Sequence, residues 1–214
     1  MRTEFHNDLE EVNRLLVAMA DEVRAAMRRA TTSLLEADLG LAEGVVAGDA
    51  AVNELHKEVE EKVYGLLARQ APVASDLRLV VTALKIAADF ERMGDLAKHV
   101  AKTAIRRYPI CAVPQELGTV IRNMADVADR IAGKISTVVA SPNAAGAAEL
   151  EFDDDAMDEL HKGLFVLLLG AAWQHGVESA IDGALLGRFY ERFADHAVNA
   201  GHHMYFLVTG DQLT

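Results

Sequence analysis

Two short stretches of this sequence carry side chains suited to chemistry, and they are nearly identical. Residues 90–95 read Phe-Glu-Arg-Met-Gly-Asp, and residues 190–195 read Tyr-Glu-Arg-Phe-Ala-Asp. In each stretch a Glu and an Asp lie four residues apart, which places both carboxylates on one face of a helix. Like charges at this spacing repel each other, and a carboxylate that faces a core is unfavourable without a cationic partner. Each stretch therefore needs a counter-charge.

Acidic residues at the same spacing recur earlier in each half of the chain. Asp49 and Asn53 precede the sequence Glu-Leu-His-Lys, and Asp154 and Asp158 precede the same four residues. This match has an offset of 105 positions, whereas the Glu-Arg-x-x-Asp stretches are offset by 100. The five-residue difference is expected at a turn between helices, where changes in length are tolerated. The chain is therefore interpreted as a duplicated unit.

The elements that position these residues are predicted to be helices. Apolar residues recur with a 3.6-residue period through six segments, and residues that favour helix are frequent. We expect helices at residues 8–39, 48–70, 76–107, 114–139, 153–174 and 177–208. Asn7 or Asp8 is expected to cap the first helix, and Gly40 or Gly44 to separate it from the second. The fold class is therefore all-α, with six long helices.

The best candidate for a boundary between the two halves is the linker between Pro109 and Pro114, because proline interrupts helices. This boundary divides the chain into a first three-helix repeat, residues 1–108, and a second, residues 109–214. Each half has the order helix, helix, short turn, helix.

The second and third helices of each half are expected to form an antiparallel hairpin. In such a hairpin, residues that face each other have a constant sum of residue numbers. Two pairs of candidate ligands share one sum in the first half, and two pairs share another sum in the second half. Half of each sum gives the expected position of the turn, near residue 72 in the first half and between residues 174 and 175 in the second. The pairs are Asp49 with Asp95, Asn53 with Glu91, Asp154 with Asp195, and Asp158 with Glu191. Neighbouring helix axes lie about 8–10 Å apart, so an ion can bridge the facing side chains.

These eight residues are the candidate metal ligands. Oxygen ligands suit magnesium, manganese or calcium, and carboxylates also bridge iron or zinc. The alternative explanation is a solvated acidic stripe that is paired with Arg92 and Arg192. Because four motifs agree with the hairpin geometry, a metal site is the preferred hypothesis. No catalytic constellation accompanies them.

Several histidines lie near the candidate ligands. His56 and His161 follow Asn53 and Asp158 by three residues, so they are ligands of second rank. His99 has no histidine at the matching position of the second half, which weakens its case. His202 and His203 lie near the end of the last helix and are interpreted as surface residues.

The composition limits the classes of function. The chain has 214 residues and a net charge of −12, which argues against binding to nucleic acid. Its single cysteine, Cys111, excludes an intramolecular disulfide framework and suits a reducing cytosol. The apolar stretch from Gly163 to Trp173 is too short to span a membrane, and we expect a helix that is buried on several sides. The N-terminal residues lack the apolar core of a signal peptide.

With these residues identified, the chain resembles the PhoU family of phosphate-signalling regulators over essentially its whole length. The resemblance rests on residues 69–78, which read Arg-Gln-Ala-Pro-Val-Ala-Ser-Asp-Leu-Arg, and on residues 85–95, which end in the first Glu-Arg-x-x-Asp stretch. Residues 191–199 add to it.

The resemblance implies two tandem, pseudo-symmetric three-helix bundles whose acidic motifs hold metal ions, including multinuclear iron or zinc clusters in some members. The identity of the divalent or trivalent metal here, whether iron, zinc, manganese or magnesium, stays open. It places the ligands at Asp49, Glu91, Asp95, Asp154, Asp158, Glu191 and Asp195. Asn53 departs from the acidic pattern, so we expect the first site to bind metal more weakly.

The resemblance also implies a non-enzymatic, cytoplasmic regulator that represses phosphate-starvation genes when phosphate is plentiful. The implied partners are the ATPase subunit of the phosphate ABC transporter and a sensor histidine kinase, so any association with the membrane goes through partners. We also expect a homodimer, although the residues themselves carry no signal of the oligomeric state.

Two alternatives remain open. One is a helical adaptor whose acidic stripe binds a basic partner without metal. The other is a ferritin-like di-iron carboxylate oxidase, which uses Glu-x-x-His pairs from one four-helix bundle. Against the oxidase, Asp158 and His161 form such a spacing in one half, but the other half has Asn53 and His56.

Overall fold

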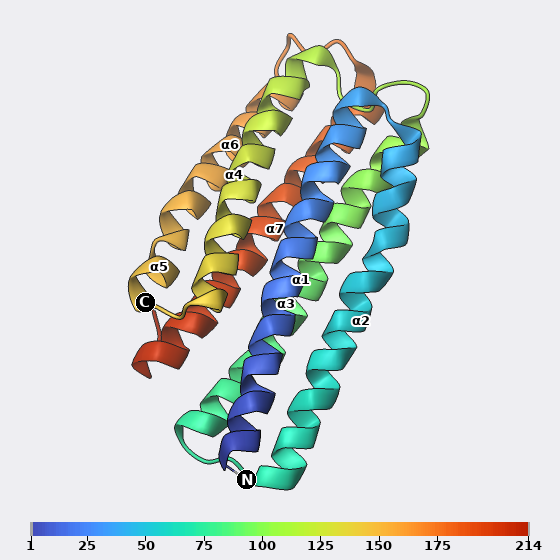
Figure 1. The fold of residues 1–214 in the computed structure, drawn as a ribbon. Coiled ribbons are helices and arrows are strands. Elements are labelled where there is room, and N and C mark those ends of the chain that lie inside the picture. The colour runs from blue at the N-terminus through green and yellow to red at the C-terminus, as the bar shows by residue number, and fades with distance from the viewer. Residues whose placement is uncertain (1, 214) are drawn as a thin grey trace.

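Seven helices and no strand make up residues 2–213, the part of the chain that the computed structural model describes. They run lengthwise in one elongated bundle (Figure 1). The helices are α1 (Arg2–Glu36), α2 (Leu39–Gln70), α3 (Ser75–Arg107), α4 (Gln115–Ala140), α5 (Ala144–Ala148), α6 (Leu150–Leu169) and α7 (Gly176–Thr209). The predicted all-α fold is confirmed, and α5 is a short addition to the six long helices that the sequence predicts.

The two halves of the chain pack side by side and share one core. In the first half α2 packs against α1 and α3, and in the second half α6 packs against α4 and α7. The halves meet where α1 contacts α4 and where α3 contacts α7. Figure 1 shows that α3 and α7 run in opposite directions, with the α2–α3 turn and the α6–α7 turn at opposite ends of the bundle. The two repeats are therefore related by a pseudo-twofold axis that passes between α3 and α7.

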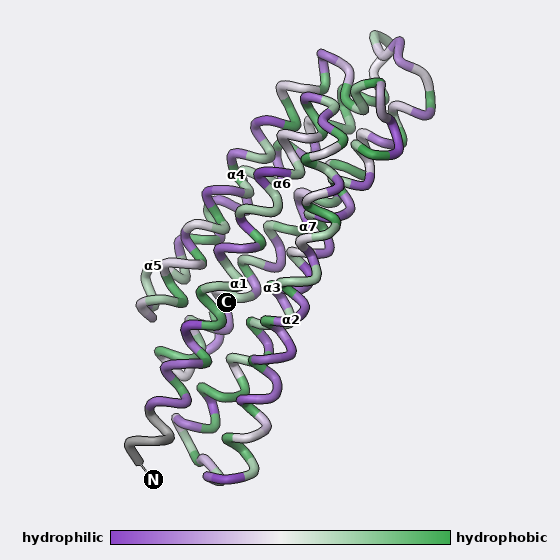
Figure 2. Tube along the Cα trace, turned by 45° about the vertical axis from the view of Figure 1, so that its right-hand side comes forward, coloured by the Kyte–Doolittle hydropathy of each residue, from purple (hydrophilic) through white to green (hydrophobic). Residues whose placement is uncertain are grey.

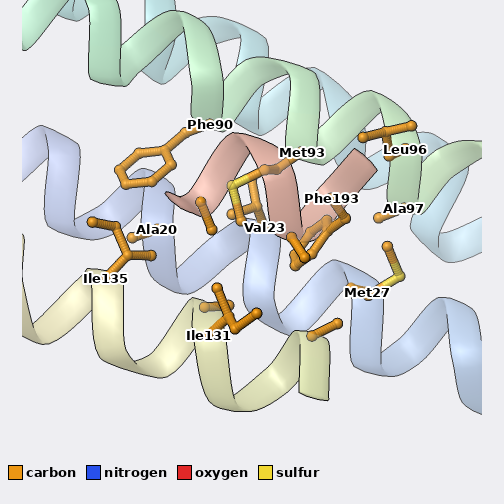
Figure 3. Packing of buried hydrophobic residues seen from close by; sticks show 14 of the residues in the cluster. Ala20, Val23, Met27, Phe90, Met93, Leu96, Ala97, Ile131, Ile135 and Phe193 are labelled. Atoms are coloured by element: carbon orange, nitrogen blue, oxygen red, sulfur yellow. The ribbon is translucent and has the colours of Figure 1, made fainter. Parts of the chain in front are cut away.

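Side chains from four helices fill the space between the halves. Figure 3 shows Phe90 and Met93 of α3 beside residues of α1 and α4, with Phe193 of α7 close by. These three side chains have no exposed surface. Figure 2 shows hydrophobic and hydrophilic residues alternating along the helices, as amphipathic helices that pack on one face require. Burial of these apolar faces is the main stabilising contribution of the fold.

The start of α1 differs from the expected one. Asn7 and Asp8 do not cap the helix, because α1 begins at Arg2. The carboxylate of Asp8 instead accepts a hydrogen bond from Arg69 at the end of α2, at 3.1 Å. The acidic side chain thus links two helices where the sequence predicted a helix start.

The break between α1 and α2 also lies earlier than expected. Asp38 caps α2, and its carboxylate accepts a hydrogen bond from the backbone N–H of Leu41 at 2.9 Å. Gly40 and Gly44 therefore lie inside the helix, ahead of the expected start near Gly48. Tertiary packing outweighs the low helix propensity of glycine here, because buried residues of this segment pack against α1.

The helix expected at residues 153–174 lies closer to the N-terminus, since α6 covers Leu150–Leu169. Its early end absorbs the length difference between the repeats. Leu169 corresponds to Tyr64 in α2, which continues to Gln70. The difference is therefore taken up by the end of a helix and not only by the turn.

The apolar stretch from Gly163 to Trp173 is not buried on several sides, so that expectation is wrong. Leu164 and Leu168 lie in the core, but Val166 is 75% exposed and Leu169 is 84% exposed. Helix α6, which carries most of this segment, packs within residues 2–213 against α4, α5 and α7 and against no helix of the other half. No helix within residues 2–213 is long and apolar enough to cross a membrane.

We predict that the two halves are held together at one end by Asp182. This carboxylate of α7 is 4% exposed and accepts hydrogen bonds from Arg106 and Arg107 at the end of α3, at 2.6 and 2.5 Å. Replacing Asp182 by Ala leaves two guanidinium groups without their buried partner, so the free energy of unfolding should fall by about 2–4 kcal/mol in chemical denaturation. Glu178→Ala is the matched control, because Glu178 also pairs with Arg107 but its side chain is 80% exposed. An equal loss in both variants would contradict this assignment.

Candidate metal centre

The repeated Glu-Arg-x-x-Asp segment sends its side chains in three directions. The aromatic residue that precedes it, Phe90 or Tyr190, is fully buried in the core. Tyr190 shares a buried hydrogen bond with the hydroxyl of Thr31, at 2.7 Å, which fixes the ring. Because the aromatic side chain sets the rotation of the helix, Glu and Asp turn towards the preceding helix of the hairpin, and Arg turns towards the other repeat.

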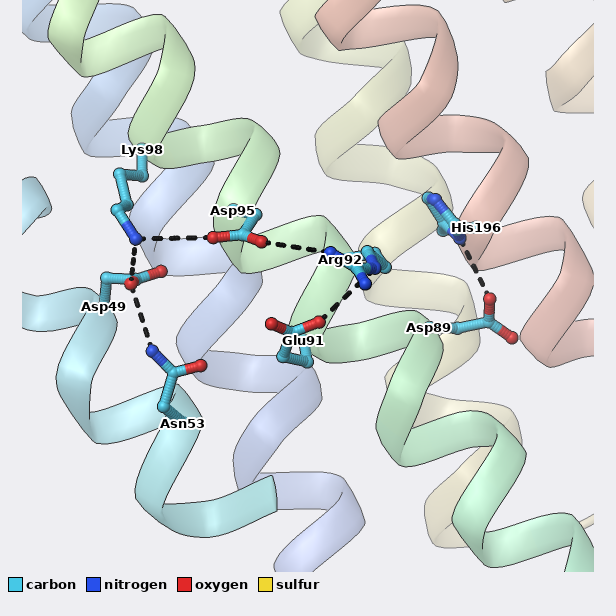
Figure 4. Close-up of polar contacts among 8 residues, drawn as sticks. All are labelled: Asp49, Asn53, Asp89, Glu91, Arg92, Asp95, Lys98 and His196. Atoms are coloured by element: carbon cyan, nitrogen blue, oxygen red, sulfur yellow. Dashed lines mark hydrogen bonds and ion pairs between the residues drawn. The ribbon is translucent and has the colours of Figure 1, made fainter. Parts of the chain in front are cut away.

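The N-terminal cluster consists of Asp49, Asn53, Glu91 and Asp95. The hairpin prediction that places Asp49 opposite Asp95 is confirmed. The ammonium group of Lys98 lies between these two carboxylates and donates to both, at 2.5 Å to Asp49 and 3.3 Å to Asp95 (Figure 4). Asn53 donates a further hydrogen bond to Asp49 at 3.1 Å.

The charges of the N-terminal cluster are thereby compensated from within the chain. The side chain of Asp49 is only 8% exposed, so its partner matters. The hydrogen bond to Asp49 raises the pKa of Lys98 and keeps it charged. The guanidinium of Arg92 lies 3.4 Å from Asp95 and 3.6 Å from Glu91. Lys98 therefore stands where the sequence predicted a metal ion.

The C-terminal cluster consists of Asp154, Asp158, Glu191 and Asp195, and it has no such lysine. Val198 stands at the position that matches Lys98. Burial, the largest cause, and the negative charges of the other three acids together raise the pKa of Asp154 to about 6. The structure thus brings the four predicted acids close enough to disfavour one another's charge.

Glu191 shares this electrostatic strain. Burial and the neighbouring Asp195 raise its pKa, and Arg188 offsets part of the effect. The guanidinium of Arg188 donates to one carboxylate oxygen of Glu191. The side chain of Arg188 is 53% exposed, so water screens its charge. One arginine therefore compensates only part of the charge of four acids.

Several ligand atoms of this cluster are buried without a partner. Oδ1 of Asp154, Oε2 of Glu191 and Nε2 of His161 have no hydrogen-bond partner among residues 7–213, whose side chains the structure describes. Burial and the charge of Arg188 lower the pKa of His161, which favours the neutral imidazole that binds metals. Buried polar atoms are normally paired, so the carboxylate and imidazole donors present here fit a divalent or trivalent cation.

The ligand arrangement is not preformed. Among the side chains described, those of residues 7–213, no group of three or more His, Cys, Asp and Glu is arranged as a ready ligand set. The helices hold the acids in proximity, and mutual repulsion is smallest when the carboxylates turn apart. Binding a cation would therefore require rotation of side chains on fixed helices.

Sequence reasoning missed Lys98 and Arg188, the cations that meet the two clusters. A position-by-position comparison of the repeats carries the signal, because Lys98 aligns with Val198 and Arg188 aligns with Ala88. The predicted second-rank ligand His161 does lie in the C-terminal cluster, near Asp158 and Asp195. His56, in contrast, makes no hydrogen bond or ion pair among the side chains of residues 7–213.

The interpretation of His203 as a surface residue is wrong. Its side chain lies between α7 and α3, with Nε2 3.7 Å from Asp89. Burial lowers the pKa of His203. Asp89 also contacts Nδ1 of His196 at 2.9 Å, so this carboxylate of α3 joins two histidines of α7. His202 does lie at the surface, where it contacts Glu151.

Comparison with known proteins identifies relatives over almost the whole chain. The family model described as the PhoU domain matches residues 16–104 and 121–204. The chain is 46% identical over 210 residues to the "Phosphate-specific transport system accessory protein PhoU homolog 2" of Mycobacterium tuberculosis, covering 98% of this chain and 99% of the relative.

Solved structures have the same fold. The crystal structure of PhoU from Pseudomonas aeruginosa superposes with a TM-score of 0.88 at 28% identity, covering 97% of this chain and all of the other. The phosphate transport system regulatory protein PhoU from Streptococcus pneumoniae also gives a TM-score of 0.88, at 23% identity and 98% and 99% coverage.

We predict that Asp154→Asn stabilises the metal-free protein at neutral pH. Folding raises the pKa of Asp154, so the folded protein is more stable when this carboxyl group is protonated. The free energy of unfolding therefore falls as pH rises from about 4, the pKa of an unfolded Asp, through the folded pKa of about 6. The variant should exceed the wild type by about 1–2 kcal/mol at pH 7 and by little at pH 4, after allowance for solvent screening.

Chemical denaturation in the presence of a chelator at pH 4, 5.5 and 7 measures this difference. Asp126→Asn serves as the control, since Asp126 is an exposed acid on α4 and is not among the charges that raise the pKa of Asp154. A stability gain for Asp154→Asn that does not change with pH would argue against charge repulsion as its cause.

Proposed function

The chain belongs to the PhoU family, and from that premise we propose that it is a regulator of phosphate uptake that represses the phosphate-starvation response. In this role it connects the ATPase subunit of the phosphate ABC transporter to a sensor histidine kinase. The observation that carries the proposal is the family match over both repeats, together with a relative named as a phosphate-specific transport system accessory protein at 46% identity. The family consists of accessory and regulatory proteins of transport and not of enzymes.

The proposed regulator binds a metal ion at the C-terminal cluster. Asp154, Glu191 and Asp195 would supply the oxygen ligands, with His161 as a nitrogen ligand. The bound ion would supply positive charge that neutralises the acids. Support comes from the raised pKa of Asp154 and from the buried donor atoms without partners. Because the acids lie on α6 and α7, their neutralisation favours close packing of this hairpin.

The N-terminal cluster is proposed to bind metal only when Lys98 is displaced. Its ammonium group already contacts Asp49 and Asp95, and Asn53 leaves this cluster with one acid fewer. An ion that enters would have to separate the partly buried Lys98 from the buried carboxylate of Asp49, which is costly. One chain is therefore proposed to carry one tight metal site and one internally compensated site.

A di-iron oxidase is less compatible with this arrangement. The two clusters lie on separate hairpins, α2–α3 and α6–α7. Within residues 2–213 these hairpins contact each other through α3 and α7, whereas α2 and α6 do not touch. A ferritin-like centre draws its ligands from all helices of one four-helix bundle.

We predict that Lys98→Val adds a metal site. The substitution installs the residue that the second repeat has at this position. It leaves Asp49 without its lysine partner and leaves Arg92 as the remaining cation beside Asp95 and Glu91. Equilibrium dialysis against Mn²⁺ with elemental analysis should show about one additional ion per chain, bound more weakly than the first.

Lys102→Val is the matched control, because Lys102 is exposed on the same helix and lies outside the N-terminal cluster. If the wild type already binds at both clusters, or if Lys98→Val gains no ion, then Lys98 does not take the place of a metal.

The regulatory proposal predicts that cells without this protein express phosphate-starvation genes in high phosphate. Complementation with the wild type should restore repression of a reporter gene. Asp195→Ala should restore it only in part, because it weakens metal binding, and it should remain folded, because losing one acid relieves repulsion. Asp155→Ala should behave as the wild type.

Co-fractionation with membranes at high and low phosphate tests the partner claim in the same strains. Unchanged reporter expression in cells that lack the protein would remove the regulatory proposal. If purified Asp195→Ala is globally unfolded, its partial repression does not result from weaker metal binding, and that explanation is wrong.

A further inference from the structure

A surface pocket of about 420 Å³ lies where the pseudo-twofold axis passes between α3 and α7. Its lining residues are Arg92, Asp95, Leu96, His99, Arg192 and His196. Arg92 and Arg192 occupy the same position in the two repeats, as do Leu96 and His196. Because α3 and α7 cross in opposite directions near these residues, the duplication brings its two arginines to one pocket.

The two arginines are only partly neutralised. Among the side chains of residues 7–213, no carboxylate lies within 4.0 Å of Arg192. The contacts of Arg92 with Asp95 and Glu91 are long, at 3.4 and 3.6 Å. Asp95 also lines the pocket, but Lys98 already contacts its other oxygen. Two arginines and one acid therefore line the pocket, while Glu91 and Asp89 lie beside it as partners of Arg92 and His196.

The histidines of the pocket are held in defined orientations. Nδ1 of His196 contacts Asp89, which leaves Nε2 of the same ring as the nitrogen that is not engaged by Asp89. His99 stacks on Phe189 of the opposite helix, with ring centroids 5.2 Å apart. Figure 4 shows Arg92 between the acids of the N-terminal cluster and the Asp89–His196 pair. Hydrogen-bond donors from both repeats thus surround one space.

We propose that this pocket binds a phosphate group through Arg92 and Arg192. Guanidinium groups form paired hydrogen bonds with two oxygens of a tetrahedral anion, and two of them match the double charge of phosphate. The pocket has room for inorganic phosphate with bridging water, and also for the phosphate end of a larger molecule. The site is distinct from the metal cluster on α6 and α7, and it does not depend on the proposed regulatory role.

The location of the pocket gives binding a structural consequence. A phosphate group held by one arginine from each repeat bridges the two halves of the molecule. It also draws Arg92 away from Asp95 and Glu91, which leaves Lys98 as the main partner of Asp95. Binding is therefore expected to stabilise the contact between α3 and α7.

Isothermal titration with inorganic phosphate on the chelator-treated full chain tests the proposal, at constant ionic strength maintained with chloride. A parallel titration uses the monoester glycerol 3-phosphate. We expect saturable binding of one anion per chain. Arg92→Gln/Arg192→Gln should weaken it at least about tenfold, since each charge-assisted contact contributes that much or more.

The control variant Arg14→Gln/Arg122→Gln removes the same charge from exposed arginines outside the pocket, and it should bind as the wild type does. Binding of phosphate identifies the free ion as the ligand, and binding of the monoester alone identifies an esterified phosphate group. If neither binds, or if binding survives in Arg92→Gln/Arg192→Gln, the proposal is wrong.

Discussion

Repulsion between carboxylates that rigid helices hold face to face is the constraint on which this molecule depends. The α2–α3 and α6–α7 hairpins each bring acidic residues from two helices into a partly buried position, where water screens their charges weakly. Such an arrangement requires a cation. The first repeat supplies Lys98 from its own chain, whereas the second supplies only the exposed Arg188 and leaves donor atoms unpaired. Duplication has therefore produced two similar sites with different needs.

Core packing fixes this geometry. Phe90, Tyr190 and Phe193 have no exposed surface, so α3 and α7 cannot rotate about their axes without opening the core. With that rotation fixed, the acids must face the hairpin partner and the arginines must face the other repeat. One short segment of helix thus contributes to the core, to an acidic cluster and to the pocket on the pseudo-twofold axis.

Much of the fold follows from local patterns. The apolar periodicity predicts the long helices. The constant sum of facing residue numbers places Asp49 opposite Asp95, because two antiparallel helices rise by the same distance per residue. Helix ends were predicted less well. Asp38 caps α2 where glycines had suggested the break, and residues 163–173 expose much of their apolar surface, because both features depend on packing partners that periodicity does not identify. The counter-cations were missed for a different reason. The long side chain of Lys98 reaches across the hairpin to Asp49. In the sequence, Lys98 is distinguished only by comparison with Val198, which has the matching position in the second repeat.

The most direct test of this account is the position of bound metal in crystals of the metal-loaded protein, located by anomalous scattering at the absorption edge of the metal. The account predicts an ion between α6 and α7 with oxygens of Asp154, Glu191 and Asp195 among its ligands. It also predicts that Lys98 remains between Asp49 and Asp95 with no ion in that cluster. An ion in the N-terminal cluster with Lys98 displaced, or an empty C-terminal cluster at saturating metal, would contradict it.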